Sequence, residues 1–192
     1  DLGTATHTDT VTLGTTTSIA GPISVYAGTI NVNANLNTSG GGANGDILLK
    51  ASGAITQASN VSVTTTGGDV TYWADSDSTN GGYIWLKSGS SITTTSAAGN
   101  IVLSGGNVAN AAALATTGYA SGMTTTIGNG VTLDATSLYS FGGDITVRGK
   151  SAANSTTYSS TDATSSSSAN GIRAHGSVTV DAGAGKLSMW GY

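Results

Sequence analysis

The chain contains no cysteine and no glutamate, has a single proline (Pro22), and carries charge on only 8% of its residues. An average globular domain has about 25% charged residues. Without cysteine, disulfide bonds are excluded. No run of about 18 apolar residues occurs, so no helix is expected to span a membrane. The basic residues are scattered and the isoelectric point is near 4.6, which argues against nucleic acid as a partner.

In place of charged residues the chain is rich in glycine, serine, threonine, asparagine and alanine, which favour turns and strands over helices. We therefore expect almost no helix. Disorder is the competing interpretation, but disordered chains combine low hydrophobicity with high net charge. Here 38% of residues are hydrophobic and the net charge is only -4, so we expect an ordered chain.

A short phrase recurs along the chain: a glycine, a small polar residue, and two apolar residues separated by one. Its clearest copies are Gly45–Leu49, Gly68–Tyr72, Gly99–Leu103 and Gly143–Val147. Apolar pairs at this spacing indicate strands with one buried face. The full set of pairs is Ile47/Leu49, Val61/Val63, Val70/Tyr72, Ile84/Leu86, Ile101/Leu103, Val131/Leu133, Ile145/Val147, Val178/Val180 and Leu187/Met189. Such recurrence predicts one structural unit stacked many times.

Two folds can bury such strands without helices. An antiparallel sandwich would use Asn-Gly hairpins, and four such pairs occur: Asn44-Gly45, Asn80-Gly81, Asn129-Gly130 and Asn170-Gly171. In three of them, however, the glycine leads into a strand after a long polar stretch and does not directly follow another strand. We therefore predict an all-β, right-handed parallel β-helix (β-solenoid) with irregular coil length, about six to nine turns tall. Residues 1–192 are expected to form a single β-solenoid domain, a segment or subunit of a longer assembly.

Strand alternation assigns side-chain directions. It places Trp73, Tyr83 and Trp85 outside, and flat aromatic faces suit sugar rings or another protein surface, so these three are the candidate surface-contact residues. The alternative is that one or more of them packs under a loop such as Asp75–Gly82. The polar residue after each turn glycine is expected to bind backbone amides at a corner and to align with its counterparts in a ladder of Asp46, Asp69, Asn100 and Asp144.

The Gly-Asp/Asn-Ile-x-Leu phrase, the small polar filler and the lack of cysteine resemble the repeat regions of bacterial filamentous-haemagglutinin-like exoproteins, which are large secreted adhesins. The resemblance runs along essentially the whole chain and rests on composition. It implies a secreted or surface-attached right-handed β-helix that serves in adhesion or as a long shaft. It implies no particular functional residue.

Residues suited to catalysis or metal binding are few, and we expect no enzyme, cofactor or metal site. His7 and His175 lie in unrelated segments, and Asp75-Ser76-Asp77 is only a fragment of a calcium-binding loop. A polysaccharide-degrading enzyme would need clustered carboxylates in one groove. Outward threonines at 64–66 and 93–95 resemble an ice-binding face, but their spacing along the chain is irregular. An ice-binding protein and a polysaccharide-degrading enzyme therefore remain distant alternatives.

The ends of the predicted fold suggest its partner. A β-helix exposes unpaired backbone groups on its terminal coils, and neither end of this chain shows a capping helix or a charged cluster. We therefore expect an extracellular or cell-surface filament that self-associates end to end. The alternative is an adhesin module that binds glycans or a host surface. The stretch Ser151–Asn170 is open to three interpretations: a flexible loop, a target of O-linked sugars, or an ordered coil.

Overall fold

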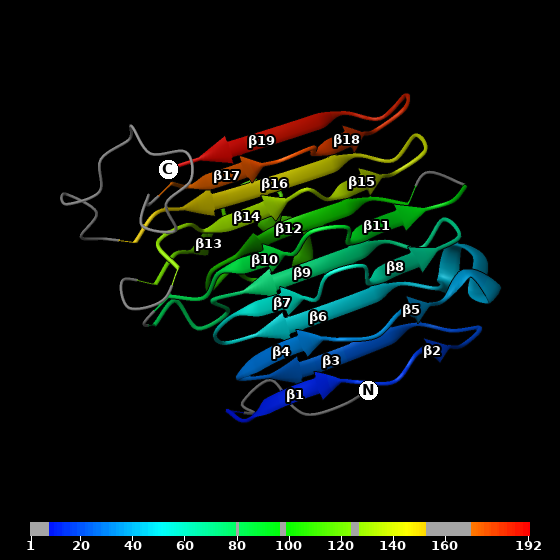
Figure 1. Ribbon diagram of the computed structural model, residues 1–192, viewed down its shortest axis with the longest axis horizontal. Helices are drawn as coiled ribbons and strands as arrows, with labels where there is room; N and C mark the ends of the chain where they lie inside the picture. The colour runs from blue at the N-terminus through cyan, green and yellow to red at the C-terminus, as the bar shows by residue number, and fades with distance from the viewer. Residues whose placement is uncertain (1–7, 80, 97–98, 124–126, 153–169) are drawn as a thin grey trace.

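The computed structural model describes residues 8–79, 81–96, 99–123, 127–152 and 170–192. These residues are mostly β, and their strands stack into three parallel sheets (Figure 1). Three consecutive strands, one in each sheet, make one coil, and the described residues contain six such coils. This arrangement is consistent with the β-solenoid-like, all-β parallel fold predicted from the repeated phrase.

The strands of each sheet follow one another at intervals of a coil. Sheet B contains β1 (Thr10–Leu13), β4 (Thr29–Val32), β7 (Ile55–Gln57), β10 (Ile84–Leu86), β14 (Val131–Asp134) and β17 (Ile172–His175). Sheet C contains β2 (Thr17–Ser18), β5 (Leu36–Asn37), β8 (Ser62–Thr65), β11 (Ser91–Thr94), β15 (Ser137–Tyr139) and β18 (Thr179–Asp181). Sheet A contains β3 (Ile23–Ala27), β6 (Ile47–Ala51), β9 (Val70–Ala74), β12 (Ile101–Gly105), β16 (Ile145–Lys150), β19 (Leu187–Gly191) and the short β13 (Ala120–Ser121).

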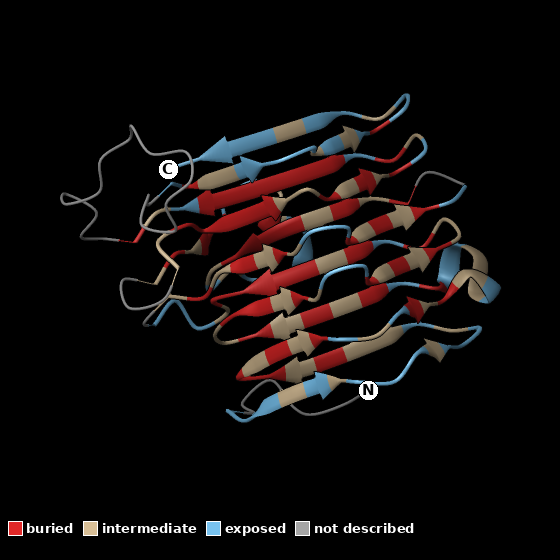
Figure 2. Cartoon of the chain, viewed as in Figure 1, coloured by how far each residue is buried: buried red, intermediate tan, exposed pale blue. Residues whose placement is uncertain are grey.

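A column of apolar side chains runs through the stacked coils. In sheet A the first positions pair in register: Ile47 with Val70, Val70 with Ile101, and Ile101 with Ile145. All of them are buried, and each such side chain contributes about 1.5–3 kcal/mol by leaving water. The predicted inward pairs are confirmed as buried from Ile47/Leu49 to Ile145/Val147, as the red bands of Figure 2 illustrate.

The last coil is the exception. Val178 and Val180 are half-buried, while Leu187 and Met189 are 46% and 42% exposed. Leu187 and Met189 continue the column in register with Ile145 and Val147. They are exposed because no described strand pairs with the outer edge of β19.

One polar pair lies inside the column. The Tyr72 hydroxyl donates to Gln57 Oε1 at 2.8 Å, and Gln57 Nε2 lies 2.8 Å from the Val61 carbonyl and 3.0 Å from that of Ser91. Burial raises the pKa of Tyr72 far above its usual range. The pair satisfies its own hydrogen bonds, which a buried polar group requires.

The recurring glycines are needed for close stacking. At Gly68, a Cβ atom would lie 2.5 Å from the carbonyl carbon of Gly45 in the coil below, and at Gly99 it would lie 2.4 Å from the Gly68 oxygen. Neither residue is among those with positive φ. The glycine of the repeated phrase is therefore a packing requirement between coils.

Most of the variation in coil length comes from chain inserted between sheet A and the next strand of sheet B, after β9, β12 and β16. The described parts of the insertions after β9 and β12 lie on the same side of the molecule (Figure 1). Most of the Ser151–Asn170 stretch (153–169) lies outside the described residues. Helix in the described residues is confined to the 3-10 turn η1 (Ser39–Asn44) and to α1 (Ala111–Leu114).

Candidate functional site

The corner that precedes sheet A carries a hydrogen-bond ladder between coils. Asp46 Oδ1 accepts from the Asp69 amide at 2.8 Å, and Asp69 Oδ1 accepts from the Asn100 amide at 2.7 Å. Asn100 Oδ1 accepts from the Asp144 amide at 2.9 Å, and Asp144 Oδ1 accepts from the Lys186 amide at 2.8 Å. The ladder predicted from the repeated phrase is confirmed. Its side chains bind the protein's own backbone.

A second row of polar groups at the same corner escaped the sequence analysis. Four fully buried hydroxyl groups each donate to the carbonyl oxygen of a phrase glycine, which keeps that oxygen satisfied. The pairs are Thr38 with Gly45, Thr65 with Gly68 (2.6 Å), Thr94 with Gly99 (3.0 Å) and Ser140 with Gly143. The hydroxyl residue precedes its glycine by varying distances along the chain, so no fixed spacing marks it in the sequence.

A hollow of about 390 Å³ lies between this ladder and α1. Asp69, Asn100 and Asp144 line it together with alanines of the helix. The Oδ1 atoms of all three already accept backbone amides. The ladder explains these side chains without a ligand.

Trp73 is the clearest correction to the predicted surface residues. Its side chain points away from the apolar column, as strand alternation required, but it is only 5% exposed. The indole Nε1 donates to the Gly106 carbonyl at 2.8 Å, and the Lys50 ammonium lies 3.7 Å from the ring centroid. The prediction of an exposed Trp73 is wrong because the chain after β12 covers it. Desolvation lowers the pKa of Lys50.

Tyr83 and Trp85 are half-buried on the outer side of sheet B. Burial raises the pKa of Tyr83, and the Lys87 ammonium lies 4.7 Å from the Trp85 ring. Trp85 Nε1 is buried without a hydrogen-bond partner among the described residues. The structure therefore places Trp73 in sheet A and the other two around sheet B, so the three do not form one patch.

The most exposed aromatic side chains were missed by the sequence analysis. Phe141, Trp190 and Tyr192 are 60%, 55% and 72% exposed. Trp190 follows the inward pair of the last strand, so strand alternation alone could have identified it as outward-facing. The Arg148 guanidinium lies between the rings of Trp190 (5.5 Å) and Tyr119 (4.3 Å).

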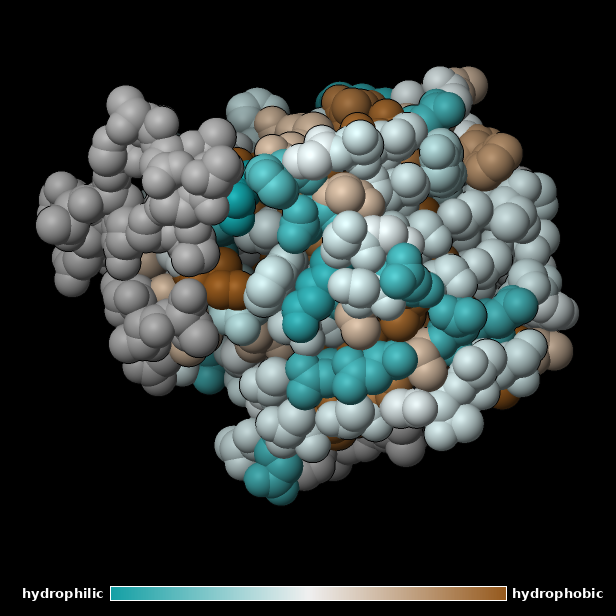
Figure 3. Space-filling view, in the orientation of Figure 1, coloured by the Kyte–Doolittle hydropathy of each residue, from teal (hydrophilic) through white to brown (hydrophobic). Residues whose placement is uncertain are grey.

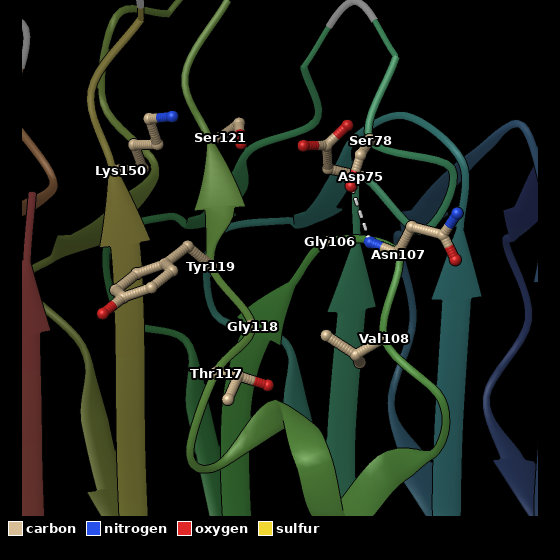
Figure 4. A pocket seen from close by; sticks show the side chains of 10 residues that line it. All are labelled: Asp75, Ser78, Gly106, Asn107, Val108, Thr117, Gly118, Tyr119, Ser121 and Lys150. Carbon is tan, nitrogen blue, oxygen red and sulfur yellow. Dashed lines mark hydrogen bonds between the residues drawn. The ribbon is translucent and has the colours of Figure 1, made fainter.

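The insertions after sheet A enclose a second hollow, of about 290 Å³. Figure 4 shows Asp75 from the β9–β10 loop across the hollow from Ser121 and Lys150, while Ser78 of the same loop is bonded to the Asn107 amide. Asp75 is only 4% exposed, and its Oδ1 atom has no hydrogen-bond partner among the described residues. Burial raises the pKa of Asp75 to about 6, and the nearby charge of Asp77 raises it further. A hydrogen bond from Ser121 and the positive charge of Lys150 act in the opposite direction.

No family model, curated protein or solved structure matches this chain.

The residues considered from the sequence as metal ligands or catalytic residues do not come together in the structure. His175 Nδ1 lies 2.9 Å from Asp134 Oδ1 on the surface, and His7 lies outside the described residues. Among the described residues, no three His, Cys, Asp or Glu side chains are grouped as metal ligands. No helix in the described part of the chain is long and apolar enough to cross a membrane.

The threonine rows divide between two environments. Thr64 and Thr93 pair in register and are half-buried on the outer side of sheet C, whereas Thr65 and Thr94 are fully buried. Thr66 and Thr95 approach to 3.0 Å between their hydroxyl oxygens. The outward row thus spans only part of the stack.

The last coil presents apolar side chains at its outer edge. Leu187, Met189, Trp190 and Tyr192 are all exposed there. In Figure 3, brown apolar residues lie along the upper edge, over the position of β19. The upper edges of β17, β18 and β19 have no partner strand among the described residues.

Proposed function

We propose that this chain is a structural segment of a secreted, adhesin-like surface fibre, folded as a right-handed β-helix whose last coil stacks on the first coil of another copy. The observation that carries the proposal is the exposed apolar pair Leu187 and Met189, which continues the buried column in register. Exposed strand edges of this kind favour further pairing.

The corners of the first and last coils are compatible with such a junction. Pro22 occupies the ladder position in the first coil, because Ile23 pairs with Ile47, and proline has no amide hydrogen to donate. Lys186 occupies the same position in the last coil, and its ammonium group cannot accept a hydrogen bond. At such a junction the position without an amide donor, Pro22, would face the position without a side-chain acceptor, Lys186.

The core positions of the two coils are also complementary. Continuing the present registers would place Leu187 on Ile23, Met189 on Val25, and Ile172 on Val11. All of these side chains are apolar. Low surface charge supports the same conclusion, since 8% charged residues give little repulsion between copies.

Light scattering over a range of concentrations, combined with electron microscopy, tests the proposal. Wild-type chain is expected to form species that lengthen with concentration and to show the strand spacing of about 4.8 Å along the fibre axis. The double variant Leu187→Lys/Met189→Lys is expected to remain monomeric. Leu48→Lys, on the outward side of β6, is the matched control and should assemble like the wild type. A wild-type chain that stays monomeric at high concentration would refute end-to-end stacking.

A further inference from the structure

The hollow beside Asp75 is built by three successive coils. The β9–β10 loop supplies Asp75 and Ser78, the β12–β13 segment supplies the wall from Gly106 to Ser121, and β16 supplies Lys150 (Figure 4). Its volume of about 290 Å³ is just below the range of roughly 300–1,000 Å³ found for ligand pockets. The space suits one small ring.

Backbone hydrogen bonds hold the walls in place. The Asp75 amide donates to the Gly53 carbonyl at 3.1 Å, so the loop begins on the coil below. Gly82 and Ser121 exchange two backbone bonds, of 2.9 and 3.0 Å, and this fixes Ser121 against the same loop. The Lys150 carbonyl accepts from the Gly122 amide at 2.9 Å. The site is therefore organised before any ligand arrives, which lowers the entropic cost of binding.

Asp75 is the group that needs a partner. Its backbone has φ of 50°, a conformation that asparagine and aspartate tolerate better than most residues. The side chain is buried, and Oδ1 has no donor among the described residues. A buried acceptor without a partner costs free energy and commonly marks a functional site.

The remaining walls indicate the kind of ligand. Lys150 donates hydrogen bonds, and Ser121 and the side-chain amide group of Asn107 both donate and accept. The Asn107 amide nitrogen of the backbone is already bound to Ser78 Oγ at 2.7 Å. One carboxylate and one ammonium line the hollow, so its own charges balance. This favours an uncharged ligand rich in hydroxyl groups over a cation.

We propose that this hollow binds one neutral sugar residue, whose neighbouring hydroxyl groups donate to the Asp75 carboxylate and accept from Lys150. The inference goes beyond the proposed structural role and does not depend on end-to-end stacking. A fibre built from such chains would present the sugar site once per copy on its side.

Titration calorimetry and saturation-transfer NMR with glucose, galactose, mannose and N-acetylglucosamine test the site. At least one of these sugars is expected to bind the wild-type chain, and Asp75→Asn, which preserves size and backbone preference, should weaken binding about tenfold because a charged hydrogen bond is lost. Asp77→Asn is the matched control. It removes the same charge from an exposed position of the same loop and should leave the affinity within about twofold.

Three results would overturn the inference. The first is that none of the four sugars binds the wild-type chain, whether or not fibres form. The second is equal binding by wild type and Asp75→Asn, which would place the sugar elsewhere. The third is binding of methylammonium or glucosamine alone, which would make the hollow a cation site. Unchanged circular dichroism and melting temperature in both variants establish that the comparison is made between folded proteins.

Discussion

The strands of sheet A begin and end in corners that are built in opposite ways. At the beginning, the four inner coils that contain β6, β9, β12 and β16 repeat a glycine, an aspartate or asparagine of the ladder, and a buried threonine or serine hydroxyl group. At the end, each coil differs from the next, and the insertions after β9 and β12 enclose a hollow. The first corner satisfies its polar groups from coil to coil, whereas the second leaves the Asp75 carboxylate without a full set of partners.

This difference separates stability from recognition. Polar groups that saturate one another rigidify a fold and leave nothing to bind a ligand. A loop that departs from the repeat can hold an unsatisfied group, provided the stacked strands supply the stability that it loses. Substitutions in the first corner should therefore affect unfolding, and those in the second should affect binding and pH dependence.

The largest effect is expected where a glycine of the repeated phrase packs against the backbone of the coil below. Gly68→Ala would place a Cβ atom 2.5 Å from backbone carbon of Gly45, and backbone at this position cannot move without disturbing the ladder. We expect a loss of about 3 kcal/mol in the free energy of unfolding, measured by denaturant titration. Gly21→Ala is the control, since Gly21 holds the same place in the first coil and a Cβ there meets nothing within 4 Å. Similar losses in both variants would contradict the stacking explanation.

The buried hydroxyl groups should come next. Thr94→Val keeps the shape of the side chain but leaves the carbonyl groups of Gly99 and Ser140 without this donor. We expect a loss of about 2 kcal/mol in the free energy of unfolding. Thr93→Val, on the outer side of the same strand, should change it by no more than about 0.5 kcal/mol. If the two variants unfold alike, the hydroxyl row does not stabilise this corner.

The sequence predicts a corner well when the residues that interact there are close together along the chain. The ladder was predictable because glycine and its aspartate or asparagine are adjacent in every copy of the phrase, and strand alternation then identified the inward pairs. The hydroxyl row was not predictable, since Thr94 and Ser140 meet only after two coils have stacked. Handedness stays a prediction, as do secretion and adhesion.

The second corner was predicted less well because its contacts join distant parts of the chain. Trp73 was expected at the surface, and only the fold brings Gly106 onto its indole nitrogen. The sequence marked Asp75-Ser76-Asp77 as a fragment of a calcium-binding loop. It could not indicate that Asp75 is buried against Ser121 while Asp77 remains exposed, because the covering segment belongs to a later coil.

The buried carboxyl group of Asp75 should make stability depend on pH. Its pKa is raised from 3.8 to about 6 in the folded chain, so the folded state holds a proton that the unfolded state has released. The resulting stabilisation is complete below the unfolded pKa and is lost as the pH rises through about 6. Between about pH 5 and pH 8 we expect a decrease of about 1 kcal/mol in the free energy of unfolding, after allowing for solvent screening.

The variant Asp75→Asn isolates this contribution. Subtracting its unfolding free energy from that of the wild type at each pH removes the contribution of the other titrating groups. The difference should decrease by about 1 kcal/mol between about pH 5 and pH 8. Asp77→Asn, in the same loop but exposed, should retain most of the wild-type pH dependence. A wild-type profile parallel to that of Asp75→Asn would show that the carboxyl group titrates normally.

The smallest effect is expected from a single rung of the ladder. Asp69→Ala removes the acceptor for the backbone amide and the side-chain Nδ2 of Asn100, which lie 2.7 and 3.0 Å from it. Water can replace this acceptor at an exposed corner, so we expect a loss of only about 0.5–1 kcal/mol, with faster hydrogen exchange at the Asn100 amide. Asp69→Asn keeps an acceptor oxygen and should protect that amide as the wild type does. If exchange also accelerates at Asp144, the rungs act cooperatively along the stack; if Asn100 keeps its protection in Asp69→Ala, the ladder contributes no order of its own.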